Sequence, residues 1–421
     1  MRLDASMPAN QLDAAIVRAV SLGTVTAWES SVAKFTAEAR HNPFAPHYFA
    51  ERYNYELAMA QVRRFRRSAG RVPDVARADG DTHRLYSFAA MLSIVYDRLP
   101  KAGRKSLSGR VQGALRDDTG LGPLAFEFLI ASHLTQKGWD VEWRDWDGGG
   151  YDFLVRRGSA EMEVECKAFS ADLGRKVHRQ HHYQLGGLLG GDIGSALDKY
   201  GSIFVDTVIP GRLDTAIDAV AGVIKTVLRS GADAEGPDPA VVRLHKLARD
   251  DLPFDPDSDD LNASDISSLA ERQFDCVNPS MLVMARRGRG IAIFSIRSAK
   301  RDDLVGGMYK QLKHGSTQFS GTRPAILCAH LLDMRPAEIM SLHAEQEKGN
   351  HTGLNLIATR LFNGNRPYLH TLQFTAPGLP HKTQTIAGNT RRRHYMESGA
   401  AFIFANPKHP EAQNPAFSIT S

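Results

Sequence analysis

Residues 146–168 read WDGGGYDFLVRRGSAEMEVECKA and contain the clearest structural pattern in the chain. The run that begins at Asp152 is typical of a strand. Residues 157–159, Arg-Gly-Ser, are typical of a tight turn, because glycine tolerates positive φ and serine can bond its own backbone. Residues 161–169 then alternate polar and apolar with a period of two, which is typical of a second strand. The stretch therefore predicts a β-hairpin.

The alternation in the second strand assigns its side chains to two faces of a sheet. One face carries Glu163, Glu165 and Lys167, and the other carries Val164 and Cys166. We expect Cys166 to be buried on the apolar face as a small hydrophobic residue and not to act as a nucleophile.

The predicted hairpin brings Asp152 close to Glu165 and Lys167 at one end of a sheet. Two carboxylates beside an ammonium group offer the hard oxygen ligands that Mg²⁺ prefers. Phosphodiester cleavage needs such a set, because negative charge has to be stabilised at phosphorus and a water has to be activated. The plain alternative is a solvated face of a half-buried sheet.

Asp152, followed by Glu165-Cys166-Lys167 on the next strand, resembles the PD-(D/E)XK nucleases, the restriction-endonuclease-like superfamily. Tyr151 stands where the name of the motif has proline. The resemblance implies a Mg²⁺-dependent endonuclease with Asp152, Glu165 and Lys167 as catalytic residues. We expect Asp152, Glu165 and the backbone carbonyl of Cys166 to hold one Mg²⁺ or Mn²⁺ ion.

A helix is predicted from Pro123 to Lys137, because proline is accepted in a first turn and Gly138 suits a helix end. Glu127 lies on or beside the apolar stripe of this helix, where an unpaired charge is costly. Family members often carry a glutamate on this helix, so the resemblance adds Glu127 to the catalytic residues and to the metal ligands. The alternative is a glutamate at the edge of the stripe that reaches solvent.

The elements around the hairpin follow the order helix, three strands, helix, strand. The second helix is expected within residues 174–200 and the fourth strand at residues 202–208. This is the order of the αβββαβ restriction-endonuclease-like core, which the resemblance implies for residues 106–229. The predicted fold class is therefore α/β.

The flanking regions differ in character. Residues 1–105 have apolar residues at helical spacing and are predicted to form a helical accessory region. Residues 230–272 lack strong periodicity and contain six aspartates between 250 and 260, which predicts an acidic insertion or flexible loop. Residues 273–421 contain further strands and helices, and we interpret them as an α/β extension of the nuclease domain.

Five polar residues are expected to contact nucleic acid. Lys176, Arg179 and Gln180 open the helix that follows the hairpin, and Arg391 and Arg392 lie in a basic loop. Such side chains suit phosphate contacts. The net charge of +5 also favours a polyanionic partner, although it is too mild to identify one.

Composition limits the class of protein. A chain of 421 residues with 42% hydrophobic and 24% charged residues is typical of a soluble globular protein with two or three domains. The three cysteines lack CxxC spacing, which argues against disulfides or zinc. Because no apolar run reaches membrane-spanning length and no signal peptide is evident, we expect a cytoplasmic protein without a membrane partner.

The sequence therefore predicts a metal-dependent endonuclease that acts on DNA, in bacterial antiviral defence or restriction. Its protein partner could be a second copy of the chain or a separate chain of a defence system. Two alternatives remain open: a non-catalytic nucleic-acid-binding protein that retains the nuclease fold, and a nuclease that acts on RNA or branched DNA. Fold alone does not fix the substrate.

Overall fold

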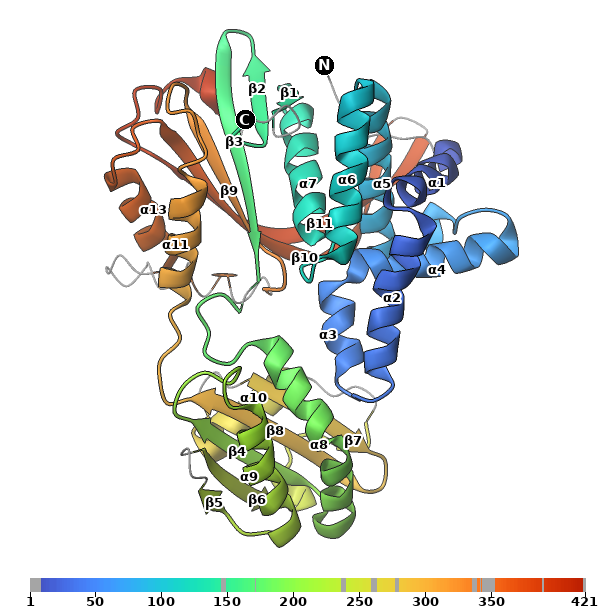
Figure 1. The fold of residues 1–421 in the computed structure, drawn as a ribbon, viewed down its shortest axis with the longest axis vertical. Coiled ribbons are helices and arrows are strands. Elements are labelled where there is room, and N and C mark those ends of the chain that lie inside the picture. Colours follow the sequence, from blue (N-terminus) through green and yellow to red (C-terminus); the bar gives the residue numbers. More distant parts are fainter. Residues whose placement is uncertain are drawn as a thin grey trace. The chain divides into compact units, whose positions relative to one another are not determined.

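A computed structural model describes residues 9–144, 149–170, 172–235, 240–258, 263–276, 280–334, 339–340, 342, 353–387 and 390–418. For residues 9, 47, 51, 235, 263, 264, 378–387 and 390–400 only the backbone is described. The chain is mixed α/β and divides into two compact units (Figure 1). Unit 1 comprises residues 1–33, 50–173 and 305–421, and unit 2 comprises residues 34–49 and 174–304.

Seven helices precede the first strand in the described part of the chain. They are α1 (Leu12–Gly23), α2 (Val25–Ala39), α3 (Ala45–Arg52), α4 (Asn54–Ala69), α5 (Gly80–Arg98), α6 (Lys101–Arg116) and α7 (Gly122–Gln136). α5 begins with a side-chain cap, because the Asp79 carboxylate accepts a hydrogen bond of 2.8 Å from the Thr82 N–H. One apolar core joins residues of α1 and α4–α7 to the sheet of unit 1, so these helices are part of that unit and not a separate accessory region.

The sheet of unit 1 has six strands in the order β1-β2-β3-β9-β10-β11. The strands are β1 (Asp140–Trp143), β2 (Phe153–Arg157), β3 (Ala160–Phe169), β9 (Ala325–Leu331), β10 (Leu369–Ala387) and β11 (Thr390–Ala405). β1, β2 and β3 are antiparallel, whereas β9 runs parallel to both β3 and β10. Within the described residues, unit 1 also includes the helices α11 (Leu304–Gly315) and α13 (Gly353–Asn363).

The two faces of β3 carry different side chains. Met162, Val164 and Cys166 belong to the apolar core that also contains residues of α7. The opposite face carries Glu163, Glu165 and Lys167, and Gly315 at the end of α11 lies against it. The sheet is thus covered by α7 on its apolar face, while α11 adjoins the face that carries the charged residues (Figure 1).

Unit 2 has its own sheet of five strands in the order β5-β6-β4-β8-β7. These strands are β4 (Ile203–Ile209), β5 (Ala234–Glu235), β6 (Val241–Lys246), β7 (Ser280–Arg286) and β8 (Gly290–Ser298). Residues of α8 (Arg179–Tyr200) and α9 (Ile217–Ser230) pack in one apolar core on the sheet, and residues of α10 (Ala263–Phe274) pack in another. Helices therefore cover both faces of this sheet, with an apolar core on each face, and unit 2 is a compact α/β structure.

The prediction that residues 174–208 supply the last helix and strand of the nuclease-like core is wrong. Those residues form α8 and β4, and β4 pairs with β6 and β8 in the sheet of unit 2. The strand that pairs with β3 is β9 instead. β4 and β9 are both short strands of mostly buried and mostly apolar residues, so their sequence patterns alone do not determine their neighbours.

The expectation of a structureless stretch at residues 230–272 is also wrong in part. Residues 241–246 form β6, and the helix α10 begins at Ala263 with Ile266, Leu269 and Ala270 buried. The predicted boundary at residue 229 therefore falls inside unit 2. The part of the chain that the structure describes includes no helix with the length and apolar character needed to cross a membrane.

Candidate active site

Asp152 and Glu165 face each other across the β2–β3 ladder. Phe153 pairs with Val164 at the end of that ladder, so the adjoining residues Asp152 and Glu165 are opposite each other. Their side chains lie on the face of the sheet opposite to that of Phe153 and Val164. The Cys166 N–H donates a hydrogen bond of 2.7 Å to Oδ2 of Asp152, and the Asp152 N–H donates one to the Glu165 carboxylate. Each carboxylate is therefore held by the backbone of the other strand.

Both carboxylates are buried. Asp152 is 8% exposed and Glu165 is 2% exposed. Burial raises the pKa of the Glu165 carboxyl to about 8, the charge of Asp152 adds to the rise, and Lys167 opposes it. The pair is therefore close enough for strong repulsion when both groups are ionised, and an added positive charge would relieve that repulsion.

Lys167 completes the group that the hairpin assembles. Its Nζ lies 2.5 Å from Oε1 of Glu165, and its side chain is 27% exposed, so the lysine is partly accessible to solvent beside the buried carboxylates. Gly315 of α11 packs against it: a Cβ at that glycine would lie 3.0 Å from both Cγ and Cε of Lys167. The absence of a side chain at residue 315 thus allows α11 to approach the lysine closely.

Glu163 anchors a loop beside this group. Its side chain is fully buried, and its carboxylate accepts hydrogen bonds from the N–H and the hydroxyl of Ser320 and from Arg323. The same loop supports the segment before Asp152, because a Cβ at Gly150 would lie 2.6 Å from the carbonyl oxygen of Gln318. Sequence reasoning missed these contacts, because alternation assigns Glu163 to a face but does not indicate which distant loop covers that face.

Glu127 lies in α7 as predicted and is 9% exposed. Nη2 of Arg110 lies 2.7 Å from both of its carboxylate oxygens, so an arginine neutralises this group. Within the described residues, no group of three or more His, Cys, Asp and Glu side chains is placed to hold a metal ion. The structure thus brings Asp152, Glu165 and Lys167 together, and the expected role of Glu127 as a further metal ligand stays a prediction.

Cys166 lies where the alternation predicts. It is 8% exposed and packs in the apolar core of unit 1, on the face opposite to Glu165 and Lys167. Burial raises the pKa of its thiol well above the usual value, and a hydrogen bond with Cys328 adds to this rise. Its thiol is therefore unsuited to nucleophilic chemistry.

Three of the five residues predicted to contact nucleic acid lie outside unit 1, which contains the hairpin. Lys176, Arg179 and Gln180 belong to unit 2, at and just before the start of α8. Arg391 and Arg392 belong to unit 1, and the prediction that they lie in a loop is wrong, because their backbone is part of β11 and pairs with β10. Their side chains lie outside the described residues. A nucleic-acid role for these five residues stays a prediction.

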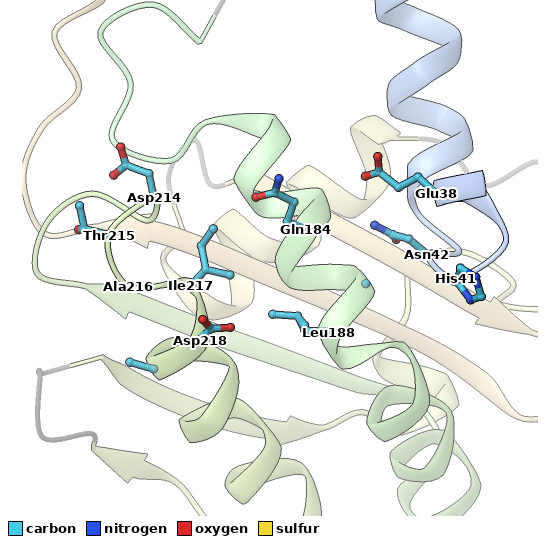
Figure 2. A pocket seen from close by; sticks show the side chains of 12 residues that line it. Glu38, His41, Asn42, Gln184, Leu188, Asp214, Thr215, Ala216, Ile217 and Asp218 are labelled. Carbon is cyan, nitrogen blue, oxygen red and sulfur yellow. The ribbon is translucent and has the colours of Figure 1, made fainter. Parts of the chain in front are cut away.

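Unit 2 contains a cavity of about 900 Å³ (Figure 2). Its wall combines three acidic side chains with amide and apolar ones: Glu38, His41, Asn42, Gln184, Gly187, Leu188, Asp214, Thr215, Ala216, Ile217, Asp218 and Ala219. The buried amide of Asn42 is bonded within the fold at both of its polar atoms, because its Nδ2 donates to the Tyr183 carbonyl at 2.7 Å and its Oδ1 accepts from the Phe44 N–H at 3.0 Å. That amide therefore fixes a turn and is not aimed at a ligand.

The hairpin brings the side chains of Asp152, Glu165 and Lys167 together. Their chemistry has to be inferred from this geometry, since no protein-family model, no curated protein and no solved structure matches the chain.

Proposed function

We propose that the protein is a metal-dependent phosphodiester hydrolase, an endonuclease that acts on DNA. The observation that carries the proposal is the meeting of two buried carboxylates, Asp152 and Glu165, with Lys167 at 2.5 Å from Glu165. Two carboxylates that share a site with one lysine form a set suited to a divalent cation and a phosphate ester.

The connectivity of unit 1 supports the same proposal. α7 precedes three antiparallel strands, β1, β2 and β3, and α11 precedes β9, which runs parallel to β3. This is the αβββαβ order expected of the PD-(D/E)XK nucleases. We therefore propose a restriction-endonuclease-like core in unit 1, with β10 and β11 as an extension of its sheet and residues 174–303 of unit 2 as an insertion between β3 and α11.

The donor chemistry of the site fits Mg²⁺ or Mn²⁺. Asp152 and Glu165 offer hard oxygen atoms, and a cation bound between them would oppose the burial and the Asp152 charge that raise the pKa of Glu165. The ion would supply positive charge for the phosphate and make an attacking water more acidic. Asp152 and Glu165 would hold it, and the two backbone hydrogen bonds fix where their oxygens point.

Lys167 would act on the substrate and not on the fold. Its ammonium group is partly exposed beside the buried carboxylates, so it can bind a phosphate oxygen or orient the attacking water. These contacts strengthen as negative charge develops in the transition state, and the lysine is therefore expected to affect turnover more than binding.

The test is a cleavage assay on plasmid, linear duplex and single-stranded DNA and on RNA, with Mg²⁺, Mn²⁺ or EDTA. Cleavage with either metal that EDTA stops, and that Asp152→Ala abolishes without unfolding the protein, supports the proposal. Cys166→Ala is a matched control on the same strand, and it should cut like the parent because its thiol faces the core. Equal cleavage by the parent and Asp152→Ala would refute the assignment.

A second candidate is a non-catalytic nucleic-acid-binding protein with the same fold. The ion pair between Arg110 and Glu127 favours it, since a guanidinium occupies the third carboxylate that the resemblance assigns to a metal. Calorimetric titration with Mg²⁺ separates the two candidates: an enzyme should bind the ion through Asp152 and Glu165, and a non-catalytic protein should show no binding that Asp152→Ala removes.

A further inference from the structure

Two cysteines lie side by side on β3 and β9. These strands are neighbours in the sheet of unit 1 and run parallel, and their register pairs Cys166 with Cys328 (Figure 1). Both residues belong to the same apolar core, so both side chains lie on the same face of the sheet. Cys166 is 8% exposed and Cys328 is 1% exposed, and the pair is therefore in the interior of the unit.

The two thiols interact with each other. A hydrogen bond with Cys328 contributes to the raised pKa of the Cys166 thiol. Cys328 also contacts its register partner on β10, since its Sγ lies 3.9 Å from Oε1 of Gln373. The third cysteine, Cys276, belongs to an apolar core of unit 2. All three are free thiols in this structure, and Cys166 and Cys328 are the two that are adjacent.

The spacing of the strands suits a disulfide between Cys166 and Cys328. Neighbouring strands lie about 4.8 Å apart, and the Cα atoms of disulfide-bonded cysteines are about 4.4–6.8 Å apart. Side chains in a strand stand roughly perpendicular to the sheet, so two register partners have to lean toward each other to form the bond. Such a bond distorts the local backbone, and strained disulfides are the ones that are easily reduced again.

A distortion at Cys166 would reach the candidate active site through the backbone of β3. The Cys166 N–H donates the hydrogen bond of 2.7 Å that holds Oδ2 of Asp152. Glu165 and Lys167 are the residues on either side of Cys166 in the chain, and their side chains lie on the opposite face. A shift of residue 166 therefore moves the donor that fixes one carboxylate and the backbone that carries the other.

We propose that Cys166 and Cys328 form a reversible disulfide under oxidising conditions, and that this bond weakens the binding of a divalent cation by Asp152 and Glu165. The disulfide is inferred from the strand register alone. Its effect on the cation rests on the proposed function, because it concerns the metal site of that hydrolase.

Hydrogen peroxide is a sufficient oxidant for this step. One thiol attacks a peroxide oxygen and becomes a sulfenic acid, and the first water leaves. The second thiol then attacks the sulfenic sulfur, the S–S bond forms and a second water leaves. The two thiols thus lose two protons and two electrons, which reduce the peroxide to two waters. Because the raised pKa of Cys166 leaves little thiolate, we expect the reaction to be slow and to need prolonged exposure.

The experiment follows the bond and the cation binding separately. The full-length parent is reduced, freed of reductant, incubated with hydrogen peroxide and alkylated with N-ethylmaleimide. Mass spectrometry of a digest made without reductant then detects any peptide from β3 that is joined to one from β9. This measurement needs no variant, so its result does not depend on how a substituted protein folds.

Calorimetry measures Mg²⁺ binding before oxidation, after oxidation and after treatment with dithiothreitol. Cys328→Ala is compared with Cys276→Ala, because each removes one buried cysteine and only the first removes a member of the pair. Thermal unfolding checks that each variant is folded, and Cys166→Ala is a second variant that lacks the pair.

In the parent and in Cys276→Ala we expect the link between residues 166 and 328, with a loss of Mg²⁺ affinity on the order of tenfold or more that dithiothreitol restores. The variants without the pair should keep their Mg²⁺ affinity through the peroxide treatment. A parent whose two thiols are never joined overturns the proposal. An equal loss of affinity in the parent and in Cys328→Ala would come from oxidation elsewhere and would overturn the effect on the cation.

The failure of this proposal is distinguishable from the failure of the proposed function. A reduced parent that binds no Mg²⁺ refutes the metal site and with it the effect of the disulfide on that site, while the peptide map still decides whether the disulfide forms. A parent that binds Mg²⁺ equally well with and without the disulfide refutes the effect alone and leaves the hydrolase intact.

Discussion

Replacement of Glu165 by glutamine should change how the stability of unit 1 depends on pH. Burial and the neighbouring Asp152 raise the pKa of this carboxyl from 4.5 to about 8 in the folded protein. Between pH 4.5 and about pH 8, the Glu165 carboxyl keeps its proton in the folded state and has released it in the unfolded state. The free energy of unfolding of the metal-free protein therefore falls as pH rises through this window and levels off above about pH 8.

The size of the effect follows from the two pKa values. At about 1.4 kcal/mol per pH unit, a pKa of about 8 in place of 4.5 corresponds to on the order of 5 kcal/mol as an upper limit. Glutamine keeps the shape of the side chain and cannot ionise. We therefore expect Glu165→Gln to be more stable than the parent by several kcal/mol at pH 8.5 and to differ little from it near pH 4.5.

Urea denaturation followed by tryptophan fluorescence is the suitable assay. The four tryptophans, Trp28, Trp139, Trp143 and Trp146, fall within the residue ranges of unit 1, so their signal reports the unit that contains Glu165. EDTA is present throughout, because a bound cation would favour the ionised carboxylate.

Glu161→Gln is the matched control on the same strand. Hydrogen bonds from Arg156 and Arg323 lower the pKa of the Glu161 carboxyl, so its charge is favourable and its loss should bring no gain at pH 8.5. If Glu165→Gln follows the pH profile of the parent, or is less stable than the parent at pH 8.5, then Glu165 is not the buried carboxyl that holds the proton.

Three further outcomes are expected. Lys167→Ala should lower turnover by on the order of a hundredfold while DNA binding weakens little, which paired kinetic and binding assays check; unchanged turnover contradicts the role of the lysine. Gly150→Ala places a Cβ 2.6 Å from the Gln318 carbonyl oxygen and should displace the neighbouring Asp152. Calorimetry should then show weaker Mg²⁺ binding by a folded variant. An affinity equal to that of the parent contradicts the link between residue 150 and the position of Asp152. Glu56→Gln keeps the acceptor for the Leu121 N–H and removes a buried carboxyl whose pKa is raised to about 7, mainly by burial. In urea denaturation the variant should be more stable than the parent by up to about 3 kcal/mol above pH 7 and should equal it near pH 4.5. A change in stability that does not depend on pH contradicts this prediction.

The local elements around the hairpin could be predicted because their signals are local. The turn at residues 157–159 was indicated by Gly158, whose φ is +62° in the structure. The strand predicted at residues 161–169 is Ala160–Phe169, and the helix predicted from Pro123 to Lys137 is Gly122–Gln136. Period-two alternation and helix-end residues identify such segments without knowledge of the rest of the chain.

The pairing of β3 with β9 could not be predicted, because pairing between strands far apart in the chain leaves no mark on either sequence. Residues 203–209 and 325–331 are both buried runs of seven residues, and only the second pairs with β3. The burial of Glu163 has the same origin. Glu161 and Glu163 share a face by alternation, yet the contacts of Ser320 bury only the second.

The way in which the chain enters and leaves unit 2 has a consequence for the order of folding. The Asp303 N–H donates a hydrogen bond of 3.0 Å to the Gly174 carbonyl, so the two ends of the segment 174–303 are in contact. Gly174 has a φ of +80°, and a Cβ there would lie 2.1 Å from the Asp303 carbonyl oxygen, so no other residue fits this crossing.

Without that crossing, pairing of β3 with β9 closes a loop of about 155 residues, from 170 to 324. Once unit 2 has folded and joined residues 174 and 303, the effective loop has about 25 residues. The entropic cost of closure grows with the logarithm of loop length, and this shortening lowers it by about 1.6 kcal/mol. Early folding of unit 2 therefore favours the parallel pairing that completes the sheet around Glu165.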